Sequence, residues 1–339
     1  PRCFIRNTIP VQARMTSILS YFIRNAIPVQ PRMTSILSYS RSNFAPGRRV
    51  YYEHSSAGRL AKRLYEILSS LGECIYLDAT DVLTGASADV LIGEPGNFQH
   101  LCTNNRIGKK ILWCSRSFDR GDLFELCDVA LGVGNRTSLS RFPEAHRGKV
   151  HLTNYSVGVA PNLPSPASRK NEFIYVATEA TELKGFREVM RVWKTMSAKL
   201  HVVGYMNDPE MQALFRESNS GQMEYHGYIP SDTAAFRSLL TSCRYVYLPT
   251  HLEGQVGTLI EALYHGLVAL TTLESGLDER VLEHAFLAAP ADTETQAGCV
   301  RTMLAMGDEE YAARQQASLA ALRTYHTWDV FDRAIKTHL

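Results

Sequence analysis

The sequence predicts an α/β protein made of two doubly wound domains that face each other across a cleft. Three observations lead to this prediction. Short apolar runs alternate with helical segments, which is typical of βαβ units in a parallel sheet. The alternation stops at a proline-rich linker, residues 161–168, and then starts again. The length of 339 residues suits two domains of ordinary size.

The composition excludes several other classes of protein. Apolar residues make up 45% of the chain and charged residues 21%, which is typical of a globular protein rather than a disordered one. No apolar stretch approaches the roughly 18 residues that would span a bilayer. The seven cysteines form no Cys-x-x-Cys pair, so we expect reduced thiols in a cytoplasmic protein, without a disulfide scaffold or a zinc site.

The first part of the chain differs from the rest. Up to residue 52 it holds eight arginines and no acidic residue, and residues 4–21 are repeated almost unchanged as residues 22–39. Two copies are too few for a solenoid, and prolines prevent a long helix. We interpret residues 1–43 as a duplicated leader outside the core. Its composition is also typical of a transit peptide or of a peripheral contact with an anionic membrane, possibilities that stay open here.

The first α/β domain is expected over residues 44–165. Residues 57–72 predict a helix, because leucines recur on one face and Gly72 can end it. The strands of this domain are expected at residues 48–54, 73–78, 88–94, 109–114, 127–133 and 149–152.

The second domain is expected over residues 166–325, and residues 326–339 form a tail that packs back on the first domain. Its strands are expected at residues 172–178, 199–205, 223–229, 244–250 and 267–272. Its helices are expected at residues 185–198, 208–218, 231–242, 257–266, 293–306 and 308–325. Ligands bind such sheets beyond the carboxyl ends of the strands, so the loops that follow these strands should converge on one site.

The loop at residues 250–258 carries the strongest chemical signal. Its glycines permit a tight turn, and the helix that begins near Thr258 directs free N–H groups and a positive dipole end at a phosphate. Glu253 and Glu261 lie on either side and can accept hydrogen bonds from sugar hydroxyls. Acid pairs at this spacing also arise by chance, but the strand–glycine–helix context favours a site for a nucleotide-sugar.

Two further loops can complete this site. Lys184 lies near the start of a helix, where a cation is unfavourable because it opposes the helix dipole. A phosphate bound in the same cleft explains a lysine at this position better than simple exposure to solvent does. In the loop at residues 226–230, Tyr228 or Ile229 could hold a nucleobase, with an ordinary strand end as an equal alternative. Thr178 ends the first strand of this domain and faces the same loops.

The segments EFIYVATEATELKGF, YHGYIPSD and EGQVGTLIEALYHGLVAL resemble the donor domain of GT-B glycosyltransferases, family four in particular. Glu253 and Glu261 match the family's two glutamates separated by seven residues. The resemblance covers about residues 172–285. It is thinner in the first domain, where residues 55–72, with Gly58, resemble the family's first glycine loop.

The resemblance implies a GT-B fold of two Rossmann-like domains, a nucleotide-diphosphate sugar donor, and transfer with retention of configuration, without a cofactor or a metal. It assigns Glu253 to the transferred sugar, Glu261 to the ribose and Lys184 to the leaving diphosphate. It also implies that phosphate or sugar oxygens are capped by the backbone of Gly254, Gln255, Val256, Gly257 and Thr258.

One departure from the family pattern concerns the diphosphate. The family has a Gly-Arg pair after the first strand of the donor domain, whereas this chain reads Ala177-Thr178-Glu179. Either Arg187, Arg280 or a cation of the first domain substitutes, or the diphosphate binds weakly. Weak binding would fit a non-catalytic GT-B module that binds a nucleotide or a glycan, or that pairs with an active subunit.

The alternatives differ in what the first domain must supply. An inverting enzyme would need a general base there, and Glu94 and His100 are the candidates. A nucleotide-sugar epimerase of similar fold is a weaker alternative. The expected acceptor is a glycan, a lipid-linked molecule or a small molecule. We expect no nucleic-acid partner, because the chain beyond the leader is net acidic.

Overall fold

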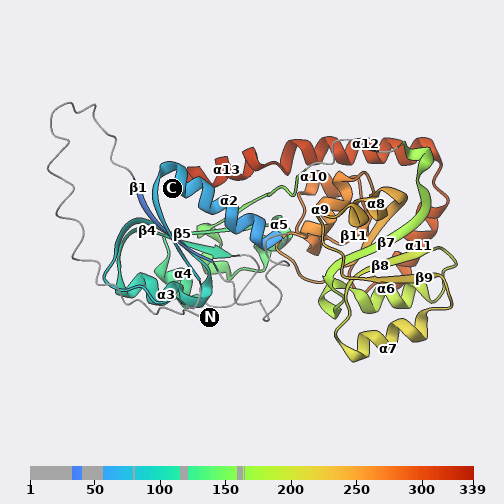
Figure 1. The fold of residues 1–339 in the computed structure, drawn as a ribbon, viewed down its shortest axis with the longest axis horizontal. Helices are drawn as coiled ribbons and strands as arrows, with labels where there is room; N and C mark the ends of the chain where they lie inside the picture. Colours follow the sequence, from blue (N-terminus) through green and yellow to red (C-terminus); the bar gives the residue numbers. More distant parts are fainter. Residues whose placement is uncertain (1–32, 40–55, 79–80, 115–120, 159–162, 164) are drawn as a thin grey trace, which may run out of the picture.

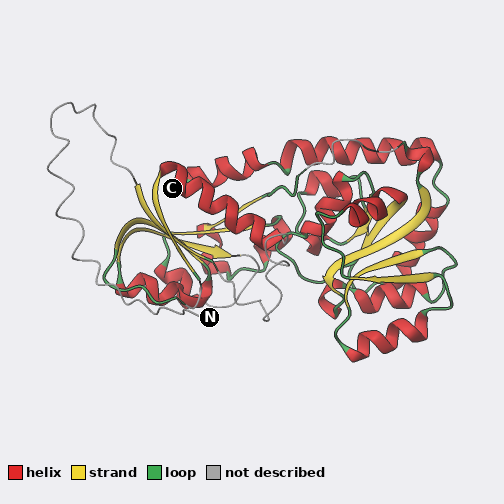
Figure 2. Ribbon diagram, viewed as in Figure 1, coloured by secondary structure: helices red, strands yellow, loops and turns green. Residues whose placement is uncertain are grey.

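The computed structural model describes residues 33–39, 56–78, 81–114, 121–158, 163 and 165–339. In this part of the chain, two parallel sheets of six strands each are flanked by helices (Figures 1 and 2). The predicted fold class is therefore confirmed. The strand predicted at residues 48–54 lies outside the described residues.

The N-terminal sheet has the strand order β2-β1-β3-β4-β5-β6, and all its pairings are parallel. Its strands are β1 Met33–Ser38, β2 Gly72–Leu77, β3 Ser87–Gly93, β4 Arg106–Cys114, β5 Val129–Val133 and β6 Val150–Thr153. Its helices are α2 Ser56–Leu71, α3 Pro95–Asn104, α4 Gly121–Leu126 and α5 Arg136–Ser140, followed by the 3₁₀ helix Glu144–Lys149. On α2, Leu60, Leu64 and Leu68 are buried, as the leucine spacing predicts.

Strand β1 corrects the interpretation of the leader. It comes from the second copy of the repeat and lies between β2 and β3, with Ile36 and Leu37 fully buried. The hydroxyl of Ser38 donates a hydrogen bond of 2.7 Å to the Asn97 side chain. The prediction that residues 1–43 lie outside the core is therefore wrong for residues 33–39. The six-residue strand is covered by neighbours on both edges, so a short, partly polar run suffices.

The C-terminal sheet has the order β12-β11-β10-β7-β8-β9, again with parallel pairings. Its strands are β7 Lys170–Glu179, β8 Leu200–Tyr205, β9 Met223–Gly227, β10 Cys243–Leu248, β11 Val268–Thr271 and β12 Phe286–Leu287. Its helices are α6 Phe186–Trp193, α7 Pro209–Ser218, α8 Ala234–Ser242, α9 Gly257–Tyr264, α10 Glu279–Leu282, α11 Thr293–Leu304 and α12 Asp308–Tyr325. Among these strands and α-helices, the sequence analysis missed the two-residue strand β12 and the four-residue helix α10.

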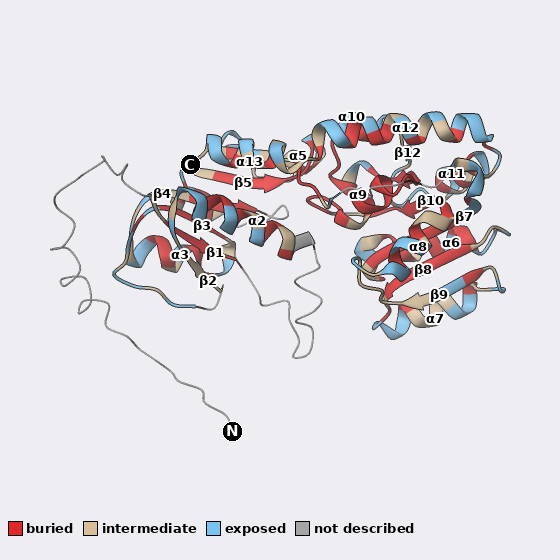
Figure 3. Cartoon of the chain, turned by 45° about the horizontal axis from the view of Figure 1, so that its top comes forward, coloured by how far each residue is buried: buried red, intermediate tan, exposed pale blue. Residues whose placement is uncertain are grey.

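The last helix, α13 (Trp328–Thr337), returns from the C-terminal domain to the N-terminal one (Figures 1 and 3). Phe331 is fully buried and meets the edge of the Trp113 ring from β4, with ring centroids 6.2 Å apart. Arg63 on α2 forms an ion pair with Asp332, with 2.5 Å between Nη2 and Oδ2. Helix α13 thus belongs to the packing of the first domain.

Buried polar groups also tie the two domains together. The His326 ring stands 3.2 Å from the carbonyl of Tyr155, and its Nε2 accepts a hydrogen bond of 3.4 Å from the backbone N–H of Asp278. Burial lowers the pKa of His326 to about 4, so the ring is neutral at physiological pH. A neutral ring can donate from one nitrogen and accept at the other, which satisfies both contacts.

In the described part of the chain, no helix has the length and apolar character needed to cross a bilayer. The expected membrane contact of the basic leader concerns residues that are almost all outside the described ranges, and it stays a prediction.

Candidate functional site

Glu253 lies at the centre of the candidate site, in the loop between β10 and α9. It is buried, with 7% of its surface exposed, and its Oε1 forms an ion pair with Nζ of Lys184. Lys184 ends a short 3₁₀ helix, Glu182–Lys184, and lies two residues before α6. The two residues that the sequence assigns to the transferred sugar and the diphosphate are therefore brought together.

Gly185 makes this approach possible. Its φ of +69° is in the left-handed region, and a Cβ there would come within 2.1 Å of the Pro249 carbonyl oxygen. The carbonyl of Leu183 accepts hydrogen bonds from the N–H of His251 and the hydroxyl of Thr250, both of 2.9 Å. The Lys184 loop is therefore docked directly on the loop that leads to Glu253.

Arg141 reaches the same point from the other domain. It follows α5, and its Nη1 donates a hydrogen bond of 2.7 Å to the carbonyl oxygen of Glu253. Its Nη2 is buried and has no hydrogen-bond partner among the described residues. Burial lowers the pKa of Arg141, with Glu274 and Glu253 opposing the shift. A buried guanidinium nitrogen without a partner can donate to an anionic ligand.

Glu261 also faces a cation of the first domain. It lies inside α9 with 9% of its surface exposed, and its Oε1 is 3.7 Å from Nη2 of Arg59 on α2. Arg59 also donates to the Ser231 hydroxyl at 2.7 Å and to the Val157 carbonyl at 2.9 Å. Burial raises the pKa of Glu261 to about 7, and Arg59 opposes this shift.

The amino end of α9 lies between the two glutamates. The helix begins at Gly257, and its N-cap residue Val256 offers no side-chain cap. The hydroxyl of Thr258 donates to the Val176 carbonyl at 3.1 Å, so this side chain ties the helix to β7 rather than pointing at a ligand. The N–H of Val256 donates to the Ser275 carbonyl at 3.0 Å, so this predicted donor is already occupied. The backbone N–H groups from Gly257 onward are the donors that an anion could use.

The side chain of Gln255 has a different role from the predicted one. Its amide nitrogen donates to the Asn154 side chain at 2.7 Å and to the Gly276 carbonyl at 3.2 Å, and its oxygen accepts from the N–H of Tyr155 at 3.1 Å. Asn154 and Tyr155 belong to the other domain. The Gln255 side chain is therefore used for hydrogen bonds across the domain junction. Only the backbone of Gln255 is left to contact a nucleotide-sugar donor.

The remaining predicted donor residues lie on the expected elements. Tyr228 follows β9 and stacks on Tyr205, with ring centroids 4.6 Å apart and planes 7° apart. Ile229 is partly buried against the core, Thr178 lies near the end of β7, and Gly58 is buried in α2. These positions fit a ligand that lies along the carboxyl ends of the C-terminal strands.

The candidate bases do not join the glutamate pair. The N–H of Glu94, which follows β3, donates to the Ser38 carbonyl at 3.0 Å. His100 lies on α3, and its Nδ1 is 3.2 Å from the side-chain nitrogen of Asn104 on the same helix. Among the contacts found for described residues, neither side chain is placed against Glu253 or Lys184.

Two candidate substitutes for the missing arginine are occupied elsewhere. Arg187 contacts Glu210 at 2.7 Å on the surface. Arg280 grips Asp278 through two hydrogen bonds of 2.7 and 2.6 Å and lies 3.3 Å from the centre of the Tyr325 ring. The cations beside the glutamates are Arg59 and Arg141 instead. The sequence suggested only some cation of the first domain: Arg59 lies in the segment 55–72 that resembles the family's glycine loop, but only the fold shows that it faces Glu261, and Arg141 lies outside the matched segments.

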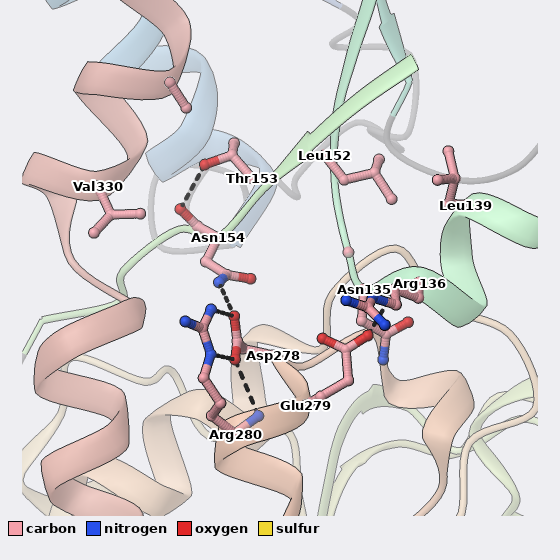
Figure 4. Close-up of a pocket in the computed structure, with 12 residues that line it drawn as sticks. Asn135, Arg136, Leu139, Leu152, Thr153, Asn154, Asp278, Glu279, Arg280 and Val330 are labelled. Carbon is pink, nitrogen blue, oxygen red and sulfur yellow. Dashed lines mark hydrogen bonds and ion pairs between the residues drawn. The ribbon is translucent and has the colours of Figure 1, made fainter. Parts of the chain in front are cut away.

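A cavity of about 470 Å³ lies at the domain junction, lined by residues that follow β5 and β6 and by residues of α10 and α13 (Figure 4). In it, Asp278 accepts from Arg280 and from Asn154, and Glu279 accepts from the backbone N–H of Arg136. Neither Glu253, Glu261 nor Lys184 lines it. We place the functional site at the glutamates, where a buried nitrogen of Arg141 has no hydrogen-bond partner among the described residues.

Two parallel α/β domains whose post-strand loops meet around such a site define the GT-B architecture. Residues 170–306 match the family model described as glycosyl transferases group 1. The chain therefore resembles GT-B glycosyltransferases of family four, as its motifs indicate, and these findings support sugar transfer in general. No curated protein sequence matches the chain.

Solved structures share the fold at low sequence identity. A sucrose-phosphate synthase from Thermosynechococcus elongatus is 13% identical, with a TM-score of 0.66 over 90% of this chain and 98% of that one. HepE from Anabaena, in complex with UDP and glucose, is 11% identical, with a TM-score of 0.63 over 90% and 98%. TarM from S. aureus is 13% identical, with a TM-score of 0.58 over 73% of this chain; the match spans 54% of TarM.

Proposed function

We propose that the protein transfers a sugar from a nucleotide-diphosphate donor to an acceptor hydroxyl, with retention of configuration. The observation that carries this proposal is the convergence of Glu253, Lys184 and Arg141 in and around the loop that leads to the amino end of α9, which its N-cap side chain leaves uncapped. One carboxylate, two cations and a helix end from two domains form a place where hydroxyls and an anionic leaving group can lie side by side.

The cations would stabilise the leaving nucleoside diphosphate. Lys184 has three N–H donors, so it can keep Glu253 and still reach a phosphate oxygen. Arg141, through its unpartnered Nη2, would take the place of the arginine that is missing at residues 177–179. Fixed charges and helix dipoles in a partly buried site favour charge that develops as the bond breaks, and we propose that they do so without a metal.

The proposed reaction exchanges one bond for another at the anomeric carbon. The acceptor hydroxyl attacks on the face from which the diphosphate leaves, and a leaving phosphate oxygen takes the hydroxyl proton. This route needs no protein base. Glu253 would hold hydroxyls of the sugar, Glu261 those of the ribose, and Tyr228 or Ile229 the base. The acceptor would be a glycan, a lipid-linked molecule or a small molecule.

The direct test is to incubate the full chain with a panel of nucleotide sugars and acceptors and to measure released nucleoside diphosphate and glycoside. Glu253→Ala and Glu253→Gln should lower turnover by roughly a hundredfold or more while the fold is retained. Glu182→Gln is the matched control, because Glu182 lies in the same loop as Lys184 with its side chain 71% exposed. Near wild-type transfer by Glu253→Ala would refute the role of Glu253.

Lys184 can be tested by binding alone. Lys184→Ala should weaken binding of a nucleoside diphosphate in calorimetry by roughly tenfold, because it removes a charge-assisted contact. A thermal-shift screen of the common nucleoside diphosphates on the wild-type chain identifies the base for this titration. Unchanged affinity in the variant would contradict the assignment of Lys184 to the diphosphate.

A second candidate function is a GT-B module that binds a nucleotide or a glycan without turnover. The specific observation in its favour is the Ala177-Thr178-Glu179 stretch, which lacks the arginine of the family pattern. A pure binder would be stabilised by nucleoside diphosphates in the thermal-shift screen yet release none from any nucleotide sugar. Release that depends on Glu253 favours the transferase instead.

A further inference from the structure

A second cluster of ligand-type side chains lies on β8 and β9, at the sheet edge opposite β12 (Figure 1). Nδ1 of His201 and Nε2 of His226 are 2.9 Å apart. The carboxylate of Glu224 lies across both, with Oε2 at 3.8 Å from Nδ1 of His201 and Oε1 at 3.9 Å from Nε2 of His226. Three side chains with suitable donor atoms therefore surround one point.

The backbone builds this cluster. In the β8–β9 register, His201 lies opposite Glu224 and Val202 opposite Tyr225, but Val203 lies opposite Gly227. His226 is therefore the extra residue of a β-bulge. Bulges re-aim side chains and are frequent near functional sites. Here the bulge accompanies a His226 ring that faces the His201 ring, with centroids 5.2 Å apart.

Glu172 on β7 determines which ring nitrogen of His201 carries a proton. Its Oε2 is 3.0 Å from Nε2 of His201, so that nitrogen carries the proton and donates a hydrogen bond to the carboxylate. The remaining nitrogen, Nδ1, then accepts from Nε2–H of His226, and a bound ion would replace this proton, which a neutral His226 ring can carry on its other nitrogen. A carboxylate that orients the far nitrogen of a histidine is the arrangement that supports metal-bound histidines.

We propose that His201, His226 and Glu224 bind a divalent transition-metal ion, with Glu172 as the residue that orients His201. Two imidazole nitrogens and a carboxylate suit Zn²⁺, Co²⁺ or Ni²⁺ rather than Mg²⁺ or Ca²⁺. Tetrahedral bonds of about 2.0–2.2 Å place neighbouring ligand atoms about 3.3–3.6 Å apart. The two nitrogens, 2.9 Å apart, lie just below this range, and the oxygens of Glu224, at 3.8 and 3.9 Å, lie just above it, so small side-chain rotations would bring all three groups to one ion.

Lys199 is the group that competes for this position. Its Nζ is 2.8 Å from Oε2 of Glu224. Lys199 is itself 36% exposed, so its ammonium can turn to water when a cation enters.

The site is distinct from the proposed transferase site. His201 is the second residue of β8, at the amino end of the strand, whereas Glu253 and Lys184 lie in loops beyond the carboxyl ends. A bound ion would join the edge strand β9 to β8, next to the turn that begins at Gly227. Its role would be to stabilise this edge, by binding the folded state alone.

The test uses the full chain, freed of metal with a chelator, and titration with Zn²⁺ in calorimetry. His226→Gln should weaken binding by at least about tenfold, and Glu224→Gln should weaken it as well. The matched control is His338→Gln, because His338 and His151 form the other histidine pair, with ring centroids 4.2 Å apart. Co²⁺ should give a visible ligand-field absorption that His226→Gln removes.

Melting temperatures in the presence of Zn²⁺ distinguish a specific site from non-specific binding. Zn²⁺ should raise the melting temperature of the wild type and of His338→Gln, but not that of His226→Gln. Glu224 is 48% exposed, so Glu224→Gln keeps the test valid if a histidine variant fails to fold. Equal Zn²⁺ affinity in the wild type and in Glu224→Gln and His226→Gln, or no binding by the wild type, overturns the proposal.

Discussion

The two domains contribute to the candidate site in different ways. The C-terminal domain supplies Glu253 and Glu261 from one loop and the helix that follows it, so a local spacing reveals both. The N-terminal domain supplies Arg59 and Arg141, which lie on different elements and reach the site only because the sheet brings α2 and α5 to the same edge. The two acids form a local motif, whereas the placement of these two arginines depends on the fold.

The duplicated segment offers a test of this contrast between local sequence and fold. Its deletion should have the largest effect on stability. Deleting residues 1–43 removes β1 from between β2 and β3 and should abolish folding of the N-terminal domain. Deleting either residues 4–21 or residues 22–39 leaves one copy of the MTSILSY segment before residue 40 and should preserve the fold. Far-UV circular dichroism and thermal melts distinguish these variants.

Two outcomes would contradict this expectation. A cooperative wild-type melt after deletion of residues 1–43 would show that β1 is dispensable. Failure of one single-copy deletion alone would show that the two copies differ in function, although only Thr8/Ala26 and Ala13/Pro31 distinguish their sequences.

The same strand shows what the sequence could not predict. MTSILS is short, half polar and set in an arginine-rich context, and it becomes a central strand only through partners on both edges, such as Ile75 and Leu91 beside Ile36. The strands of the C-terminal domain longer than two residues are predictable, because continuous apolar runs mark strands buried on both faces.

The next largest effect concerns the buried carboxyl of Glu261. Its pKa of about 7 lies above the ordinary 4.5, so between these pH values the folded state holds a proton that the unfolded state has lost. Stability therefore falls as pH rises through this window, by up to about 3 kcal/mol. Glu261→Gln should remove this fall and be more stable than the wild type at pH 8, as measured by urea unfolding at pH 5 and pH 8.

Glu182→Gln is the control, because an exposed glutamate should leave the pH dependence of the unfolding free energy unchanged. If Glu261→Gln keeps the wild-type slope, then Arg59 holds Glu261 ionised in the folded state, and burial does not dominate its pKa.

A smaller loss of stability is expected when a side chain at the domain junction is removed. Gln255→Ala removes three hydrogen bonds and leaves Asn154 and the Tyr155 N–H without their partner. An unpaired buried group costs about 1–3 kcal/mol, so the unfolding free energy should fall by roughly this amount. Nucleoside-diphosphate affinity should change little, because the Gln255 side chain is occupied by these partners and only its backbone would face the proposed donor. A large loss of affinity with unchanged stability would restore Gln255 to the donor site.

Gln255 also shows the limit of motif reading. It lies inside the best-matched segment, between Glu253 and Glu261, so its position in sequence assigns it to the donor. Its partners lie about a hundred residues earlier, and only the folded chain reveals that its side chain is occupied. Lys184 is the opposite case: its contact with Glu253 follows from two loops at the ends of neighbouring strands, β7 and β10, which the parallel sheet predicts.

The smallest effect is expected from replacing one arginine of each domain, Arg141 of the first and Arg187 of the second, and comparing how each variant binds a nucleoside diphosphate. Arg141→Met should weaken nucleoside-diphosphate binding by roughly tenfold, since it removes the buried donor that approaches Glu253 from the first domain. Arg187→Met should leave affinity unchanged and cost less than about 1 kcal/mol of stability, because its pair with Glu210 is a surface ion pair. Calorimetry on both variants decides the matter. If Arg187→Met weakens binding and Arg141→Met does not, the C-terminal domain supplies a second diphosphate cation beside Lys184, and the proposed role of the first domain's Arg141 is wrong.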